Sequence, residues 1–140
     1  MKILFVCQYF YPETFRGNDI AFHLAEEGHA VHVVTGIPNY PEGHFFTGYG
    51  LFKKRHEKIN GVNVTHLPIV PRGKDNKVML MLNYISYLIV GWLWTFFHAF
   101  LHKYDVVFCQ QLSPVTMSSP AVLYKKMRKV PLYTWVLDLW

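Results

Sequence analysis

The sequence has few cysteines and lacks the short motifs that mark common cofactor-binding and metal-binding enzymes. Cys7 and Cys109 are the only cysteines among 140 residues, and they form no Cys-x-x-Cys pair. The three-glycine dinucleotide fingerprint, the P-loop and the His-Glu-x-x-His sequence are also absent. Nicotinamide binding is therefore not expected. The first apolar run of the chain is too short to be the core of a signal peptide. Two cysteines in a chain without a secretion signal indicate a reducing, cytoplasmic setting.

Acidic residues are scarce in the second part of the chain. Residues 1–52 hold two basic and five acidic residues, whereas residues 53–140 hold twelve basic and four acidic ones. This asymmetry favours an anionic partner, such as a phosphate-bearing ligand or an acidic membrane surface, about as strongly as it favours ordinary solubilising charge. Nucleic acid is not expected as a partner, because no recognisable nucleic-acid-binding module accompanies the basic clusters.

The start of the chain predicts a β-α-β unit. Residues 3–7 form a continuous apolar run of strand length, residues 30–35 form a second one, and an amphipathic helix lies between them. Asn18 is predicted to cap this helix and Gly28 to end it. Such a unit requires a parallel sheet, whose binding loops lie at the carboxyl ends of the strands. We therefore expect functional groups in residues 8–18.

Further strands and helices follow, so the chain as a whole predicts an α/β fold with a Rossmann-like parallel sheet. Residues 36–61 form a long loop rich in glycine, proline and aromatic residues. Strands are predicted at residues 62–68, at an edge of the sheet, and at 105–109 and 131–137, with a helix up to Lys129 before the last of them. A domain of this kind ordinarily continues beyond its fifth strand. Residues 1–140 are thus predicted to be a single domain that is incomplete at its carboxyl end.

Residues 78–101 contain no Asp, Glu, Lys or Arg, and this uncharged segment is long enough to cross a membrane as a helix. Polar residues interrupt the segment, however, and strands on both sides would have to lie on opposite faces of the bilayer. We expect a long helix that covers the sheet and rests one apolar face on a membrane. An integral membrane protein with this segment as its span is the alternative.

Several residues are candidates for a site, each with a simpler explanation. Gly17 and Asn18, at the start of a helix, could present backbone N–H groups to a phosphate, or could belong to a plain turn. Asp138 follows a predicted strand end, where it could face a ligand or cap a further helix. His98 and His102 have metal-ligand spacing, but a packed or surface pair is the better interpretation, and no metal site is predicted.

An ordered set of motifs resembles a known enzyme family. The set includes Tyr-Phe-Tyr-Pro-Glu at residues 9–13, the single Gly17 and Pro-Asn-Tyr-Pro-Glu-Gly at residues 38–43. Its other members lie at residues 2–6, 28–36, 60–64, 82–87, 105–107 and 138–140. Together they resemble the amino-terminal half of a family 4 nucleotide-sugar glycosyltransferase of the WbuB-like, colanic-acid-type subgroup. Unlike many members, this chain has Arg16-Gly17 where they have a Gly-Gly pair.

The resemblance implies a GT-B architecture, in which two Rossmann-like domains face a cleft, and transfer of a sugar with retention at the anomeric carbon. It assigns the donor phosphates to Gly17 and Asn18 and the catalytic acidic position to Asp138. It places acceptor contacts at four residues: Arg16, Tyr40, Pro41 and Gly43.

The implied partners are a nucleotide-diphosphate sugar as donor and a lipid-linked saccharide as acceptor, with no metal or other cofactor. The expected location is the inner face of the cytoplasmic membrane, in surface polysaccharide synthesis. The carboxyl-terminal donor-binding domain is missing from these residues, so the fragment alone is expected to be inactive. A stand-alone flavodoxin-like binding or regulatory domain without catalysis is the alternative.

Overall fold

A computed structural model describes the chain except for residues 14, 41, 112–114 and 137–140. The sheet consists of β1 (Lys2–Val6), β2 (Ala30–Gly36), β3 (His56–Ile59), β4 (Val62–Leu67), β5 (Val106–Gln111) and β6 (Leu132–Val136). The helices are α1 (Arg16–Glu26), α2 (Lys77–Leu101) and α3 (Ser119–Arg128), with a 3₁₀ turn, η1 (Val115–Ser118), before α3. The predicted α/β fold is confirmed.

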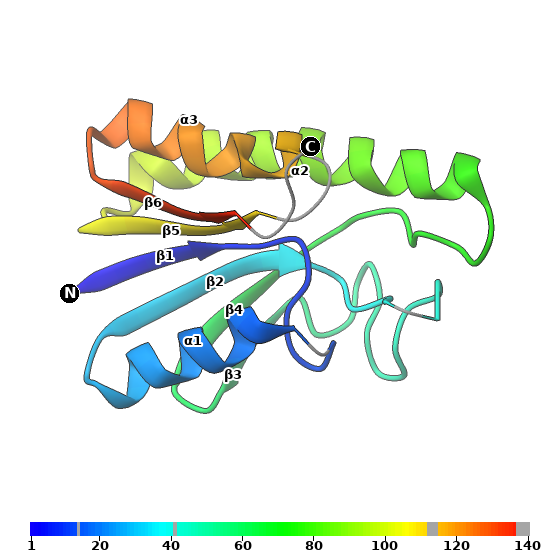
Figure 1. The fold of residues 1–140 in the computed structure, drawn as a ribbon, viewed down its shortest axis with the longest axis horizontal. Helices are drawn as coiled ribbons and strands as arrows, with labels where there is room; N and C mark the ends of the chain where they lie inside the picture. Colours follow the sequence, from blue (N-terminus) through cyan, green and yellow to red (C-terminus); the bar gives the residue numbers. More distant parts are fainter. Residues whose placement is uncertain (14, 41, 112–114, 137–140) are drawn as a thin grey trace.

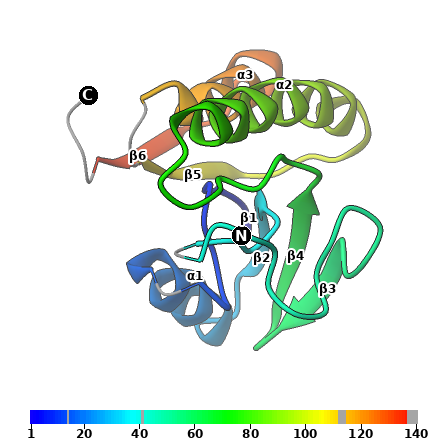
Figure 2. The ribbon, with the colours of Figure 1, turned by 90° about the vertical axis from the view of Figure 1, so that its right-hand side faces the viewer.

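The strands lie in the order β3-β4-β2-β1-β5-β6, and only β3 runs antiparallel to its neighbour. Helix α1 covers one face of the sheet, while α2 and α3 lie on the other (Figure 2). The chain builds outward from β1 to β2 and β4 on one side and to β5 and β6 on the other. In such doubly wound sheets, ligands bind beyond the carboxyl ends of the strands where the order reverses, which here is between β1 and β5.

The central strand β1 is buried on both faces, as its continuous apolar sequence predicts. Phe5 packs with Phe10 and Ala21 under α1, whereas Leu4 and Val6 belong to the core beneath α2 and α3. An alternating polar pattern would have exposed one face of this strand to water. The apolar run therefore fixes β1 in the middle of the sheet and its carboxyl end near the molecule's centre (Figure 1).

The edge of the sheet differs from the prediction. The long loop contains a strand, β3, which pairs with β4 as an antiparallel hairpin, so that β4 is an interior strand and β3 is the edge. Strand β3 has the charged sequence His-Glu-Lys-Ile, which carries no period-two apolar signal. The turn itself was visible in the sequence, because Asn60 and Gly61 both adopt positive φ, as the favoured two-residue hairpin turn requires.

The start of α1 also differs from the prediction. Phe15 occupies the N-cap position and supplies no capping side chain, while Asn18 lies inside the first turn. The Asn18 side chain instead donates a hydrogen bond of 2.7 Å to the backbone carbonyl of Glu13. Gly28 has a φ of 96° just after the helix, in agreement with its predicted role as the end of α1.

Helix α2 covers the sheet through a narrow stripe at four-residue spacing, as predicted for a covering helix. The buried residues of this stripe are Asn83, Tyr87, Gly91, Thr95 and Ala99. Gly91 allows close contact with α3, because a Cβ there would lie 2.8 Å from Cγ of Pro120. Helix α2 is long and apolar enough to cross a membrane, yet it lies along the sheet.

Candidate functional site at the carboxyl edge of the sheet

Glu13 ties together the loops that follow β1 and β2. Its carboxylate accepts hydrogen bonds from the backbone N–H groups of Phe10 (3.2 Å), Asn39 (2.9 Å) and Tyr40 (2.8 Å). The side chain is buried. Burial raises the pKa of Glu13 to about 7, because the desolvation of the charged form outweighs these three bonds and the nearby positive charge of Arg72.

Arg72 and three aromatic rings form a platform beside Glu13. The Arg72 guanidinium lies 4.9 Å from the ring centroid of Tyr40 and 5.6 Å from that of Tyr9, and it donates a hydrogen bond to the Tyr9 hydroxyl. Phe15 packs against both rings, with centroid separations of 5.0 Å from Tyr9 and 5.2 Å from Tyr40. Tyr40 remains about one-third exposed, at 36%. The arrangement combines a cation with aromatic rings, and two of these residues, Phe15 and Tyr40, are partly exposed.

Gly43 joins this platform to the basic connection after β4. It has a φ of 86°, and a Cβ there would lie 2.3 Å from the carbonyl carbon of Gly73, so only glycine fits. The Gly73 N–H donates to the Gly43 carbonyl at 2.9 Å. Next to this contact is a hollow of about 410 Å³ lined by Arg72, Gly73, Asp75, Asn76, Lys77 and Leu80. This volume lies within the range of small-molecule pockets.

Gly17 lies against Gln110 of β5. A Cβ at Gly17 would lie 1.8 Å from Oε1 and 2.8 Å from Cδ of Gln110, so the Gln110 carboxamide fills the space that any other residue would need. This contact joins the start of α1 to the carboxyl end of β5, where the strand order reverses. The glycine therefore has a packing reason that the sequence alone did not reveal. Its contact with a donor phosphate stays a prediction.

Several buried polar atoms at this edge have no hydrogen-bond partner among the described residues. They include Oε1 of Gln8, Oδ1 of Asn18 and both polar atoms of the Gln110 carboxamide. Buried polar groups are almost always paired, so these atoms, next to a helix start and a strand-order reversal, call for a partner such as water or a ligand. We call the group formed by Glu13, Gly17, Asn18, Tyr40, Gly43, Arg72 and Gln110 the carboxyl-edge site.

The structure brings four of the predicted site residues to this one edge. Asn18 bonds to the Glu13 backbone, and Glu13 in turn holds Tyr40, so the predicted donor and acceptor groups are linked through one residue. Gly17 and Gly43 belong to the same edge. Arg16 begins α1, but nothing is described of its side chain, and Pro41 and Asp138 lie outside the described residues.

Glu13, Arg72 and Gln110 were not predicted as site residues. Glu13 occurs within the Tyr-Phe-Tyr-Pro-Glu motif, and Arg72 within a basic connection, so both were visible but not distinguishable from neighbouring charges. Gln110 follows four apolar residues of β5, and a polar residue at the carboxyl end of a parallel strand is the signal that could have found it.

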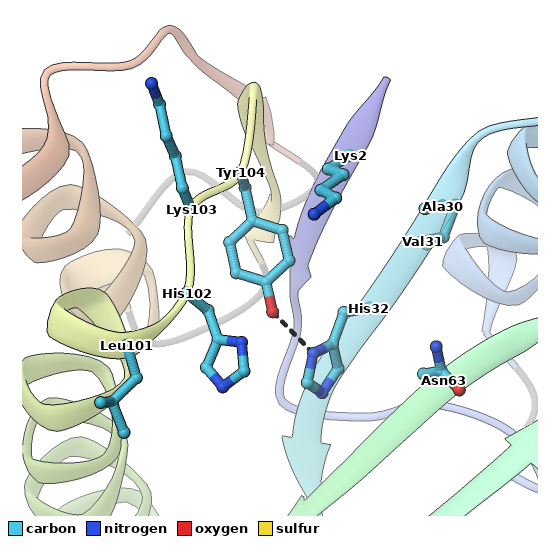
Figure 3. A pocket seen from close by; sticks show the side chains of 9 residues that line it. All are labelled: Lys2, Ala30, Val31, His32, Asn63, Leu101, His102, Lys103 and Tyr104. Carbon is cyan, nitrogen blue, oxygen red and sulfur yellow. Dashed lines mark hydrogen bonds between the residues drawn. The ribbon is translucent and has the colours of Figure 1, made fainter.

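A second hollow, of about 300 Å³, lies at the opposite edge of the sheet, where the strands begin. Figure 3 shows Tyr104 reaching across it to His32, whose Nδ1 lies 2.7 Å from the Tyr104 hydroxyl. That hydroxyl also lies 2.7 Å from Nε2 of His98. Burial lowers the pKa of His32 to about 4 and that of His98 to about 3, so both imidazoles are neutral near pH 7.

The histidines at this amino edge pack against one another. The rings of His98 and His102 stack with centroids 4.2 Å apart, and His102 is exposed, in agreement with the packed or surface pair expected from their spacing. Within the described part of the chain, no group of three or more His, Cys, Asp or Glu residues could hold a metal ion. At the amino-edge hollow, the Tyr104 hydroxyl and the imidazoles of His32 and His98 are hydrogen-bond partners of one another.

The fold and the carboxyl-edge site define a Rossmann-like α/β domain, and the comparison of structures agrees with that class. The chain is similar to the C-terminal domain of a hydrogenase from Pyrococcus furiosus, with 18% sequence identity and a TM-score of 0.55. The similarity covers 96% of this chain and 90% of that one, and at this identity it shows the fold alone. No protein-family model and no curated protein sequence matches the chain.

Proposed function

We propose that this chain is the acceptor-side domain of a retaining GT-B glycosyltransferase, which transfers a sugar from a nucleotide-diphosphate sugar to a saccharide acceptor. One observation carries the proposal. The buried, unpartnered Gln110 carboxamide lies against the start of α1 at the strand-order reversal, with an aromatic and cationic platform at the same edge. This combination suits a ligand that has both an anionic and a saccharide part.

The start of α1 suits the diphosphate. The first N–H groups of a helix carry partial positive charge, and the Phe15 side chain caps none of them here, while the Asn18 N–H donates to the Phe15 backbone carbonyl at 3.1 Å. The Gln110 carboxamide lies next to Gly17 with its oxygen nearest the glycine, and its NH₂ group has no hydrogen-bond partner among the described residues. In glycosyl transfer the bond between the anomeric carbon and the diphosphate oxygen breaks, and negative charge develops on the departing phosphate. Preorganised donors lower the energy of that charge.

The platform suits the acceptor. A sugar ring presents C–H groups on its flat faces and hydroxyl groups at its rim, so an aromatic face beside a hydrogen-bond donor suits both parts. Tyr40 supplies a partly exposed ring, and Arg72 supplies the donor beside it. In the reaction an acceptor hydroxyl forms the new bond to the anomeric carbon, and its proton passes to the leaving diphosphate. The predicted catalytic role of Asp138 belongs to this proposal and rests on the family resemblance.

A measurement of sugar transfer tests the proposal, with the protein that the complete reading frame encodes. The protein is incubated with radiolabelled UDP-glucose, UDP-N-acetylglucosamine or GDP-mannose and a membrane extract as the acceptor source. We expect label to pass from one donor into saccharide, and a Gly17→Val variant to lose most of that transfer. Gly50→Val is the matched control, because a Cβ at Gly50 meets nothing closer than 3.9 Å.

The result also separates the two functions considered. Transfer that needs Gly17 supports the glycosyltransferase. Saturable binding of a nucleoside diphosphate without transfer from any of the donors would instead favour a stand-alone binding domain. Transfer that Gly17→Val leaves unchanged contradicts the assignment of the donor phosphates to the start of α1.

A further inference from the structure

Helix α2 exposes a continuous apolar face on the side opposite its buried stripe. Apart from Lys77, every exposed residue of this helix is a large apolar one. We call this surface the α2 apolar face: Val78, Met81, Leu82, Ile85, Ile89, Trp92, Leu93, Phe96, Phe97, Phe100 and Leu101. Several of these side chains are more than half exposed, with Phe97 at 63% and Leu101 at 78%. A soluble monomer rarely leaves so long a row of apolar side chains in water.

The charges around this face are almost all positive. Arg72, Lys74 and Lys77 lie at the start of α2, and Lys103 follows its end. Arg55 borders the face directly, since it lines a hollow together with Leu93, Phe97 and Leu101. The neighbouring helix α3 ends in a further basic group, Lys125, Lys126 and Arg128. An apolar ridge flanked by cations is complementary to a bilayer surface that contains anionic lipid.

We propose that the α2 apolar face docks the domain on an anionic lipid bilayer, with α2 lying in the plane of the interface. The apolar side chains would enter the boundary between headgroups and acyl chains, while the flanking cations would contact lipid phosphates. Trp92 and the phenylalanines suit this depth, because aromatic side chains are favoured at the membrane interface. Lys77 and Arg72, at the start of the helix, also line the hollow of the carboxyl-edge site, so docking brings that site close to the lipid surface.

Contacts on the buried side of α2 favour docking over spanning. Asn83 accepts a hydrogen bond from Nε2 of Gln8 at 2.9 Å and donates to the carbonyl of Val70 at 2.7 Å. Ser86 accepts a hydrogen bond from the Val70 N–H at 2.9 Å. At the far end of the helix, Arg128 donates to the backbone carbonyl of Ala99. A helix that crossed the bilayer would have to break these bonds and expose the sheet core beneath it.

Vesicle co-sedimentation of the 140-residue chain tests the proposal. Vesicles of phosphatidylcholine with 30 mol% phosphatidylglycerol are compared with vesicles of phosphatidylcholine alone, at low and high salt. The test variant is Ile89→Glu/Phe97→Glu, which places two charges on the α2 apolar face at exposed positions. The control is Tyr133→Glu on β6, because Tyr133 is 62% exposed and Phe97 is 63% exposed. Thermal unfolding of each variant checks that the fold is retained.

We expect binding to the anionic vesicles that weakens at high salt and falls about a hundredfold in the double variant, at about tenfold for each apolar side chain withdrawn from lipid. Tyr133→Glu should bind within about twofold of the wild type, because a charge placed outside the α2 apolar face should affect binding little.

Lack of wild-type binding, or equal binding by the double variant, would overturn the proposal. If the wild type forms dimers in light scattering but does not bind vesicles, and if the double variant is a monomer, the face would be assigned to contact with a second copy of the chain. Resistance of vesicle-bound chain to alkaline carbonate would indicate a span and also contradict docking. None of these readouts measures sugar transfer, so their failure would leave the proposed function untouched.

Discussion

Replacement of Glu13 by glutamine should change how the stability of this domain depends on pH. Glutamine keeps the size of the side chain and one oxygen acceptor, but it cannot ionise. Its NH₂ group must face one of the three backbone N–H groups that now bind the carboxylate. Leaving that donor unsatisfied should lower the free energy of unfolding by about 1–3 kcal/mol, independently of pH.

The pH-dependent part follows from the pKa of Glu13. The folded protein raises this pKa from the ordinary 4.5 to about 7, so the folded state holds the proton more tightly than the unfolded chain does. Stability from this group is therefore greatest below pH 4.5 and is lost as the pH rises through 7. The full loss corresponds to about 3 kcal/mol, since each tenfold change in proton affinity is worth about 1.4 kcal/mol.

Urea unfolding of the wild type and of Glu13→Gln at a series of pH values from 5 to 8 measures this effect. The stability advantage of the wild type should shrink with rising pH by about 2–3 kcal/mol. His32 and His98 also titrate differently on folding, but they are present in both proteins and cancel in the difference. A difference that stays flat would show that the three hydrogen bonds and Arg72 balance burial at Glu13, and one that grows with pH would show that they outweigh it.

Two further substitutions test packing at the two edges of the sheet. Gly17→Val should lower the free energy of unfolding by about 1–3 kcal/mol through overpacking, and Gly50→Val by less than about 0.5 kcal/mol, as denaturant midpoints would show. Tyr104→Phe removes the hydroxyl that His32 and His98 share, and should cost about 1–2 kcal/mol at pH 7.5. His32→Gln should reduce the loss of stability in acid, because a lowered pKa gives stability that is present above pH 6.5 and is lost as the pH falls through 4.

The order of most elements could be predicted because their signals are local. The apolar run of β1, the end of α1 at Gly28 and the uncharged length of α2 each reflect burial or backbone geometry within a few residues. Strand β3 was missed because an edge strand with one exposed face and charged residues has no apolar pattern to detect. Its hairpin turn at Asn60 and Gly61 was the only local sign of it.

The site was less predictable, because its contacts join residues that are far apart in the chain. Glu13 holds Asn39 and Tyr40 across 26 or 27 positions, and Arg72 reaches Tyr9 across 63. Motif resemblance assigned Gly17 to the donor phosphates and Tyr40 to the acceptor, but it could not show which side chain occupies the space beside Gly17. That space belongs to Gln110 through the pairing of β5 with β1, which only the assembled sheet determines.

The measurement that most directly tests the carboxyl-edge site is a titration of the ¹⁵N-labelled protein that the complete reading frame encodes with UDP and GDP, followed by the backbone amide chemical shifts of residues 1–140. If the edge formed by the ends of β1 and β5 binds a diphosphate, the largest shifts should occur at Gly17, Asn18 and Gln110. The amides of His32 and Tyr104, at the opposite edge, should stay unchanged. Shifts that concentrate at the amino edge, or no shifts with either nucleotide, would contradict this assignment.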